Sequence, residues 1–295
     1  MHEISSLPNR LRVHVIGASG RTGRLLCESL VKAGAVPVPV IRNPARWLDL
    51  PGAEAPRLAD LDDHAALHAA LADASHIVSG AHARHTEALL AASGPDAMVV
   101  LLGSTRRFTR WPDAHGNGVI AGETALLTSG RRGVMLHPTM IYGAAGENNV
   151  QRLAALMHHL PLLPLPAGGR AKLQPIHAQD VVACILAALQ QDWTGPNVVV
   201  IAGPEAVSYA DFTRAIARAD GINPLRVVSL PAMLLMLGAA IARHVPGLPK
   251  VEAAEIRRLL EDKDFDIAPM QAILGVQPRT LAAGLAETFA PGDAA

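Results

Sequence analysis

Three glycines at every third position, between a short apolar run and a helix-like pattern, constrain the fold of this chain more than any other feature. The stretch reads VHVIGASGRTGRLLCESLVKAG, and the glycines are Gly17, Gly20 and Gly23. At a strand-to-helix junction they permit a tight turn, close approach of the backbone to a pyrophosphate, and close packing of the helix on the strand. The start of the helix adds N–H donors and a positive dipole end. The pattern therefore predicts a dinucleotide site rather than glycines that serve only the turn.

Apolar, β-rich runs alternate with helix-period segments through the first half of the chain. This alternation is typical of a parallel sheet covered by helices on both faces. The expected fold is α/β, a doubly wound parallel Rossmann sheet, whose ligand crevice lies at the carboxyl ends of the strands. Strands are expected at 11–17, 36–42, 75–80, 98–103 and 133–137, with a weaker one at 56–61, and helices at 22–33, 63–72, 85–92 and 118–129.

The alternation of strand-like and helix-like segments ends after Gly143. A proline-rich stretch, HLPLLPLPAGG, then precedes a strand-like NVVVIAG and several predicted helices. We expect residues 1–143 to form an NAD(P)-binding Rossmann core. Residues 144–295 are expected to complete the sheet and to form a smaller, mostly helical substrate lobe, so that the two parts make one integrated unit.

Composition argues against several other classes of protein. The chain has 26 basic and 26 acidic side chains and only 3% aromatic residues, so neither a basic face nor stacking platforms favour nucleic-acid binding. The apolar run at 231–243 is too short to cross a bilayer and is expected to be a buried or groove-lining helix, with contact to a membrane surface left open. Cys27 and Cys184 form no disulfide framework, and no apolar signal segment stands at the N-terminus, so a cytoplasmic location is expected.

The end of the second predicted strand indicates which dinucleotide is preferred. An NAD site commonly carries Asp or Glu there, to bind the ribose hydroxyls. This strand ends instead in Arg42, and the next carboxylate along the chain is Asp49. A cation at this position, with Arg21 inside the glycine turn, favours the 2′-phosphate of NADP(H) over NAD(H). The alternative is that Arg42 is only a solvated charge.

Further motifs follow in the same order as in a known superfamily. They are LLGST, GETALLTSGRRGVMLHPTMIYG, QPIHAQDVVACILAAL and FDIAPMQAILGVQP, in addition to GASGRTG and VIRNP. With them the chain resembles the atypical and extended short-chain dehydrogenase/reductases, including NmrA-like and epimerase-like proteins. The resemblance implies an NAD(P)-dependent oxidoreductase or epimerase-like activity. The expected cofactor-binding residues are Gly17, Ser19, Gly20, Arg21, Thr22, Gly23, Arg42, Asp60, Leu61, Gly80, Ala81 and Pro138.

The residue pair that transfers protons in that superfamily is missing from this chain. Active members use a Tyr-x-x-x-Lys pair for proton transfer, but the only tyrosines here are Tyr142 and Tyr209, and neither has a lysine four residues later. Alignment on Glu123 puts His115 at the tyrosine position. We therefore expect a non-standard acid, either His115 or a water molecule. Ser104, or Thr105 beside it, is expected to orient the substrate oxygen.

An unperturbed histidine titrates near pH 6.5, so His115 would give a rate that falls as the pH rises through roughly 6 to 8. His137 stands where the superfamily usually carries arginine. It either loosens the following loop or is a neutral hydrogen-bonding residue.

Other polar clusters allow two readings each. His64 and His68 have the spacing of a zinc pair, but no third ligand completes a site, which favours a solvated face. The group His82, Arg84 and His85 is expected at the crevice edge, where it contacts either ligand or solvent. The group Arg106, Arg107 and Arg110 binds an anionic substrate or stays solvated. His177 and Asp180 are expected to be structural.

Three functions stay open on the sequence. The first is an NADP(H)-dependent reductase or epimerase-like enzyme acting on a small molecule of unknown identity. The second is a dinucleotide-binding redox sensor or regulator without catalysis, and the third is an assembly or scaffold protein. Neither the substrate nor the oligomeric state follows from the residues.

Overall fold

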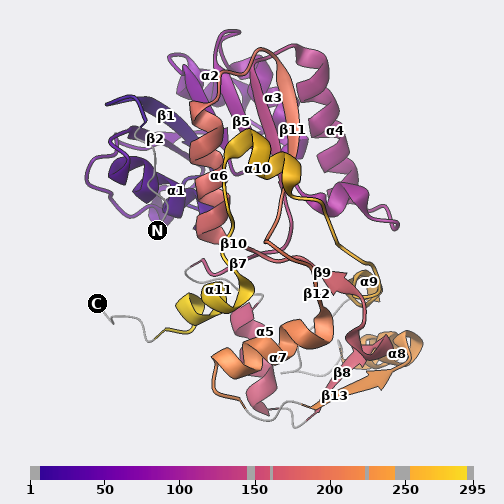
Figure 1. Ribbon diagram of the computed structural model, residues 1–295. Coiled ribbons are helices and arrows are strands. Elements are labelled where there is room, and N and C mark those ends of the chain that lie inside the picture. The colour runs from indigo at the N-terminus through magenta and orange to yellow at the C-terminus, as the bar shows by residue number, and fades with distance from the viewer. Residues whose placement is uncertain (1–6, 145–149, 160–161, 223–225, 243–252, 291–295) are drawn as a thin grey trace.

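The computed structural model describes residues 7–144, 150–159, 162–222, 226–242 and 253–290. Its largest element is a seven-stranded sheet with the strand order β11-β6-β5-β4-β1-β2-β3, all neighbours parallel (Figure 1). The strands are β1 (Arg12–Ile16), β2 (Val36–Ile41), β3 (Arg57–Leu58), β4 (His76–Ser79), β5 (Met98–Leu102), β6 (Gly133–Pro138) and β11 (Pro196–Ile201). The predicted α/β, doubly wound class is confirmed. The chain reverses its direction of progress through the sheet between β1 and β4, which places a ligand crevice at their carboxyl ends.

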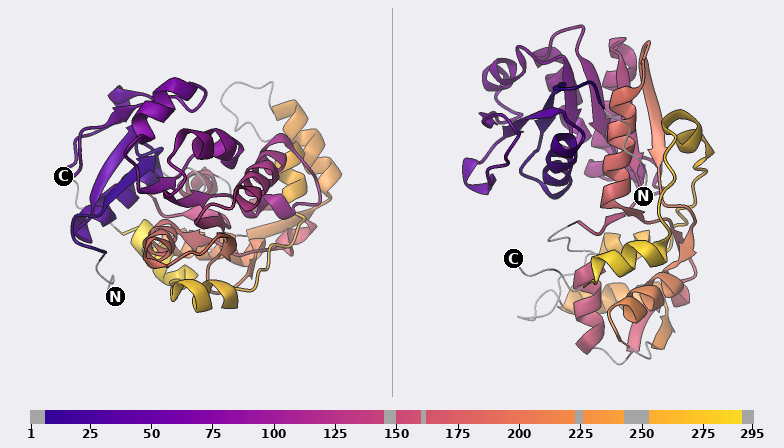
Figure 2. Two further views of the ribbon diagram at one scale, coloured as in Figure 1. Left: turned by 90° about the horizontal axis from the view of Figure 1, so that it is seen from above. Right: turned by 60° about the vertical axis from the view of Figure 1, so that its left-hand side comes forward.

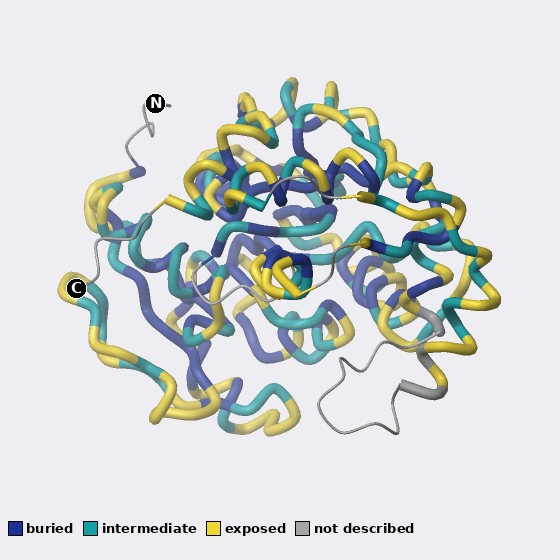
Figure 3. Tube along the Cα trace, turned by 90° about the horizontal axis from the view of Figure 1, so that it is seen from below, coloured by how far each residue is buried: buried dark blue, intermediate teal, exposed yellow. Residues whose placement is uncertain are grey.

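Helices cover both faces of the sheet, so its central strands are mostly apolar and buried, as in β5, MVVLL. One face is covered by α1 (Arg21–Lys32), α6 (Ala178–Gln190) and α10 (Ala268–Leu274), which share one hydrophobic core with the sheet. The other face is covered by α2 (His64–Leu71), α3 (Thr86–Ala92) and α4 (Ala114–Ser129), which share a second core. In Figure 3 the buried residues lie mainly in the interior of the trace, with exposed residues around them.

Helix α4 begins at Ala114, four residues earlier than the predicted 118. The side chain of Asp113 is its N-cap and accepts a hydrogen bond from the Gly116 N–H at 2.8 Å. Gly116 and Gly118 are poor helix formers, and this concealed the first turn from a propensity argument. The earlier start places His115 inside the first turn of the helix.

The second part of the molecule is a smaller lobe beneath the carboxyl ends of the strands (Figure 2). It has its own hydrophobic core, which includes the buried Tyr142. Its helices are α5 (Val150–His159), α7 (Tyr209–Ala219), α8 (Ala232–Ala242), α9 (Ala253–Arg258) and α11 (Leu281–Thr288). Its strand pairs are β7 (Ile141–Tyr142) with β10 (Ile176–His177), β9 (Lys172–Leu173) with β12 (Val207–Ser208), and β8 (Leu162–Pro166) with β13 (Arg226–Leu230).

The chain passes repeatedly between sheet and lobe. After β10 it returns to form α6 and β11 against the sheet, then runs back through the lobe, and returns once more to form α10. The second half of the sequence thus supplies both the lobe and an edge of the sheet.

The apolar segment at 231–243 is exposed along much of α8. Met233 is 77% exposed and Leu237 is 59% exposed, so the expectation of a buried helix is wrong for these side chains. Among the described residues, the main packing partners of α8 are α9 and β8. Among the described residues, no helix is long and apolar enough to cross a membrane.

Candidate cofactor and substrate site

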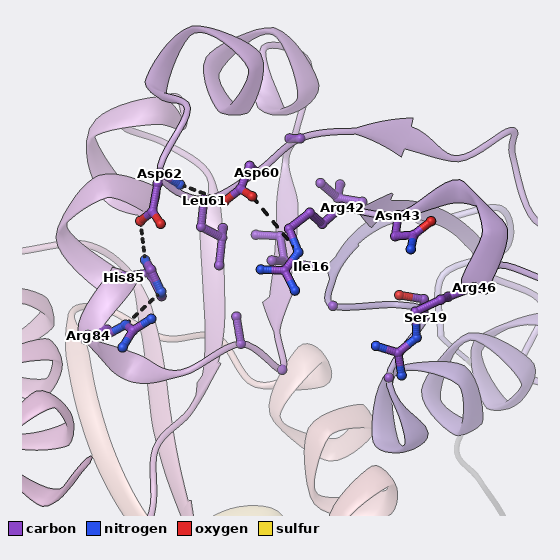
Figure 4. Close-up of a pocket in the computed structure, with 16 residues that line it drawn as sticks. Ile16, Ser19, Arg42, Asn43, Arg46, Asp60, Leu61, Asp62, Arg84 and His85 are labelled. Carbon is purple, nitrogen blue, oxygen red and sulfur yellow. Dashed lines mark hydrogen bonds and ion pairs between the residues drawn. The ribbon is translucent and has the colours of Figure 1, made fainter. Parts of the chain in front are cut away.

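A first cavity of about 400 Å³ lies at the carboxyl ends of β1, β2, β3 and β4 (Figure 4). Its walls come from the four loops that follow these strands, which is where a doubly wound sheet is expected to bind ligands. The predicted cofactor residues that line it are Gly17, Ser19, Gly20, Arg42, Asp60, Leu61, Gly80 and Ala81. Segments that are far apart in the sequence therefore meet here.

The three glycines of the turn do different things. Gly17 has a φ of +77°, a left-handed conformation that side chains rarely adopt. A Cβ on Gly23 would lie 2.2 Å from the Gly17 carbonyl oxygen, so Gly23 permits close packing of α1 on the turn. A Cβ on Gly20 would approach only that same oxygen, at 3.1 Å, so the side of Gly20 that faces the cavity is open. The open side at Gly20 fits the close approach of a pyrophosphate.

The beginning of α1 also suits an anion. Gly20 is the N-cap residue, and no side chain caps the helix there. Arg21 and Thr22 are the first two residues of the helix. The first-turn N–H groups are therefore left without the usual side-chain acceptor, which a phosphate oxygen would replace.

Two arginines stand on the β2 side of the cavity. The side chain of Arg42 is 76% exposed, and its Nε lies 4.0 Å from a carboxylate oxygen of Asp60. Arg46 follows on a short 3₁₀ turn, Pro44–Arg46, which Asn43 caps by accepting the Ala45 N–H. Arg46 and Ser19 line the same cavity, and in the view of Figure 4 Arg42 lies between Asp60 and Arg46. Sequence reasoning missed Arg46, although the NPAR turn after β2 carried the signal.

The opposite wall carries a different polar group. His85 lies 3.6 Å from Asp62, and Arg84 Nε donates to His85 Nε2 at 3.0 Å. Both Arg84 and His85 line the cavity, as the crevice-edge reading expected. His82, from the same loop, accepts the Arg84 N–H at Nδ1 and contacts His115 through Nε2.

A second cavity, of about 480 Å³, lies where the loops after β5 and β6 face the lobe. Ser104 and His115, the two predicted catalytic residues, both line it. The Rossmann side also contributes Thr105 and Thr139. Pro138 is at the end of β6, where its carbonyl oxygen accepts the Thr105 hydroxyl at 3.2 Å, and it lines neither cavity. The facing wall comes from residues 258–265.

Ser104 is held in place by a buried histidine. The Ser104 N–H donates to His137 Nδ1 at 3.0 Å, and His137 Nε2 lies 2.7 Å from Glu123 Oε2. Because a backbone N–H can only donate, Nδ1 is the acceptor and Nε2 carries the proton that is given to Glu123. Burial holds the pKa of His137 below its usual value. This geometry supports the reading of His137 as a neutral hydrogen-bonding residue, and it fixes the loop rather than loosening it.

His115 is poorly suited to be the acid near neutral pH. Its Nδ1 lies 3.1 Å from His82 Nε2, with the two rings edge to face. Partial burial, followed by the nearby Arg106, holds the pKa of His115 below its ordinary value of 6.5. A loss of activity caused by His115 would therefore be centred below pH 6.5.

The arginine cluster after β5 is paired with carboxylates. Arg106 binds Asp113 through Nε at 2.8 Å, and Arg107 forms an ion pair with Glu123 at 2.7 Å. Arg110 lies 4.0 Å from Glu261. Of these three arginines only Arg106 lines the second cavity, so the cluster as a whole is neither a free anion site nor simply solvated.

The remaining clusters line neither cavity. His64 and His68 are exposed on α2, and the described residues contain no group of three side chains suited to a metal ion. His177 caps α6 by accepting the Gln179 N–H. Asp180 accepts both the backbone N–H and the Nε of Arg279, which anchors the C-terminal segment to α6.

Comparisons with known proteins agree with this geometry. Residues 17–116 match a family model described as NAD(P)H-binding. No curated protein sequence matches the chain. Among solved structures, the NADPH-dependent quinone oxidoreductase QOR2 from Escherichia coli, complexed with NADPH, is 21% identical, with a TM-score of 0.73 over 94% of this chain and 99% of that one.

Two epimerases from Bacillus cereus are also similar. UDP-N-acetylglucosamine 4-epimerase is 17% identical, with a TM-score of 0.69 over 95% of this chain and 98% of its own. UDP-glucuronic acid 4-epimerase, in complex with UDP-glucuronic acid and NAD, is 18% identical, with a TM-score of 0.70 over the same shares. At these identities the structures establish the fold. The family-model match adds that residues 17–116 resemble an NAD(P)H-binding domain.

Proposed function

We propose that this protein is an NADP(H)-dependent reductase of a small carbonyl or quinone substrate. The observation that carries the proposal is that a dinucleotide-type cavity and a second, polar cavity lie next to each other along the carboxyl edge of the sheet. Ala81 and Arg84 line the first cavity, and His82 between them contacts His115 of the second. A cofactor held in the first cavity would therefore extend toward a substrate in the second.

The residues of the first cavity fit a dinucleotide phosphate. Gly20 leaves an open side at the start of α1, where N–H groups receive a pyrophosphate. Arg42 and Arg46 supply two cations at the end of β2, where an NAD-specific site commonly has a carboxylate. Because Asp60 partly offsets Arg42, we assign the preference for the 2′-phosphate to the two arginines together.

The second cavity fits a small polar acceptor. When bound, the cofactor supplies a hydride, and the chain itself has to position the acceptor and provide a proton. The backbone at Ser104 is fixed by His137, and Ser104 Oγ accepts the Arg106 N–H at 3.2 Å, so the hydroxyl hydrogen is left to donate to a substrate oxygen. The similar E. coli protein is an NADPH-dependent quinone oxidoreductase, which makes a quinone a reasonable first substrate to test.

The missing Tyr-x-x-x-Lys pair supports a second candidate, a dinucleotide-binding sensor or scaffold without turnover. The lowered pKa of His115 adds to it, because that residue is then largely neutral at pH 7. Both candidates share the cofactor site. They differ in whether anything is reduced.

One set of measurements separates the candidates. Calorimetric titration with NADPH and NADH measures binding, and the loss of reduced-nicotinamide absorbance measures turnover with phenanthrenequinone and nitrobenzaldehyde. We expect tighter binding of NADPH than of NADH and measurable turnover. Tight NADPH binding without turnover of either compound would favour the sensor, and no binding of either dinucleotide would refute both candidates.

Several properties remain expectations. The two free cysteines, Cys27 and Cys184, are buried, which is compatible with the reducing cytoplasm expected from the sequence. We expect no nucleic-acid partner. Membrane-surface contact through the exposed side of α8 stays open, and flotation with lipid vesicles would test it.

A further inference from the structure

One wall of the second cavity brings in a lysine that sequence motifs did not indicate. Lys263 lines the cavity together with Ser104 and His115, although it comes from the segment that leads from the lobe back to the sheet. It is partly buried. Within the described part of the chain, no hydrogen bond or ion pair holds its ammonium group. An ammonium group without such a partner in the second cavity has its N–H donors available to a ligand.

The segment around Lys263 is fixed from both sides. Glu261 is buried, and its carboxylate accepts the Arg110 N–H at 2.6 Å and the Thr109 hydroxyl at 3.0 Å. The Lys263 N–H donates to the Lys172 carbonyl at 2.9 Å. Two residues later, the Phe265 N–H donates to Gln174 Oε1, and the Phe265 ring lies 5.7 Å from Phe108. Lys263 is therefore presented by a braced segment.

The acidic neighbours of Lys263 are engaged elsewhere. Glu261 is occupied as described, and Asp264 forms an ion pair with Lys172 at 2.8 Å. Asp262 accepts the Lys172 backbone N–H at 2.8 Å. The cations and titratable groups that share the cavity are Arg106, Arg258 and His115. Burial, with further contributions from Arg258 and Arg106 that Glu261 opposes, lowers the pKa of Lys263 from its ordinary 10.5.

We propose that Lys263 binds the reducible oxygen of the substrate and donates a proton to it, in place of the absent tyrosine. This inference rests on the proposed reductase function. A carbonyl carbon accepts a hydride, with NADPH as the reductant, so a C–H bond forms and the C=O π pair moves to oxygen. That oxygen takes a proton from Lys263 Nζ, so an N–H bond breaks and an O–H bond forms. The neutral amine regains its proton from water.

The division of roles follows from the protonation states. At neutral pH His115 is largely neutral, so it is left to hydrogen-bond and orient the substrate, as is Ser104. Lys263 is protonated at neutral pH as long as its pKa stays above 7. A lowered pKa makes its ammonium group a stronger acid than that of a free lysine. The acid comes from the lobe, across the cavity from the place where the superfamily carries its tyrosine.

The first test does not depend on activity. The chain has four lysines, so reductive methylation with ¹³C-formaldehyde gives few dimethyl-lysine resonances to assign. We expect one resonance to titrate below the others and to be lost in Lys263→Met, and nitrobenzyl alcohol, a product-like probe, to shift it in the presence of NADP⁺. Titration of Lys263 like the other lysines, or a resonance that the probe leaves unchanged, would overturn the proposal.

The second test separates this inference from the proposed function. Lys263→Met should bind NADPH like the wild type and lower kcat for nitrobenzaldehyde by about 100-fold or more. In the wild type, kcat should decline on the alkaline side at a pH below about 10.5, as Lys263 loses its proton, and this decline should be absent in Lys263→Met. Lys263→Arg should keep substrate binding but not kcat, and Lys32→Met, an exposed lysine on α1, is the matched control. Wild-type kcat and pH profile in Lys263→Met would refute Lys263 alone. Failure of the wild-type protein to bind NADPH or to reduce either test compound would refute the proposed function, and the inference with it.

Discussion

Replacing Arg42 and Arg46 by alanine tests how this site would distinguish NADPH from NADH. A hydrogen bond to a charged group contributes about 1.5–3 kcal/mol. The side chain of Arg42 is 76% exposed and lies 4.0 Å from Asp60, so solvent and the carboxylate both weaken its effect. We therefore expect about 1.5 kcal/mol for Arg42→Ala, the low end of that range. This corresponds to roughly tenfold weaker NADPH binding.

The double variant should show what the pair does. Arg46 is also exposed, and among the described residues no carboxylate forms an ion pair with it. If each arginine contributes independently, the loss for NADPH is about 3 kcal/mol, or roughly 150-fold. NADH affinity should change less than about threefold, because NADH lacks the phosphate that both cations would contact.

The assay is calorimetric titration with NADPH, NADH, and the fragments 2′,5′-ADP and 5′-AMP. The fragments contain only the adenosine half of each cofactor. In the double variant, the ratio of the affinities for 2′,5′-ADP and 5′-AMP should therefore fall in parallel with the ratio of the affinities for NADPH and NADH. Arg152→Ala, which removes an exposed cation on α5 in the lobe, is the control for net charge. Equal losses for NADPH and NADH in the double variant, or a loss of similar size in Arg152→Ala, would refute the assignment of these arginines to the 2′-phosphate.

Two further predictions concern the turn and the sheet. Gly20→Val should leave the protein folded but abolish dinucleotide binding. Gly23→Ala should instead lower the melting temperature, because its Cβ would meet the Gly17 carbonyl oxygen at 2.2 Å. A folded Gly20→Val variant with normal NADPH affinity would show that the turn is only structural. Hydrogen bonds from Arg57, then Arg12, hold the pKa of Asp73 well below its ordinary 3.8, so its ionised form stabilises the fold above that value and the effect is lost as the pH falls below it. Urea unfolding should show Asp73→Asn less stable by about 1 kcal/mol at neutral pH, after allowance for the exposure of the carboxylate; a difference that stays the same in acid would contradict this.

Much of the Rossmann part could be predicted because its signals are local. The strand–glycine turn–helix unit at the N-terminus is specified by residues adjacent in sequence, and the central strands, buried on both faces, are short, mostly apolar runs. The carboxyl ends of such strands necessarily share one edge of the sheet. The sequence alone therefore assigned the residues after β1, β2 and β4 to one cavity.

The second cavity could be predicted only in part, because half of its wall is distant in sequence. Ser104 and His115 were found by their motif positions, but Lys263 lies about 150 residues further on, in a stretch with no motif. Its position follows from contacts such as that of Glu261 with Thr109. No periodicity or spacing encodes contacts of that kind.

Protonation states show the same division. Residue type alone gave His115 an ordinary titration range, and only the packed structure, with Arg106 and partial burial, lowers its pKa. Likewise the tautomer of His137 follows from its two partners, Ser104 and Glu123. The sequence by itself determined the sheet, the glycine turn and the site of the dinucleotide, since these depend on backbone geometry and on short-range hydrophobic pattern. Only the tertiary structure decided which side chains face the substrate and in which charge state, because desolvation and charge–charge interaction depend on distances that packing alone sets.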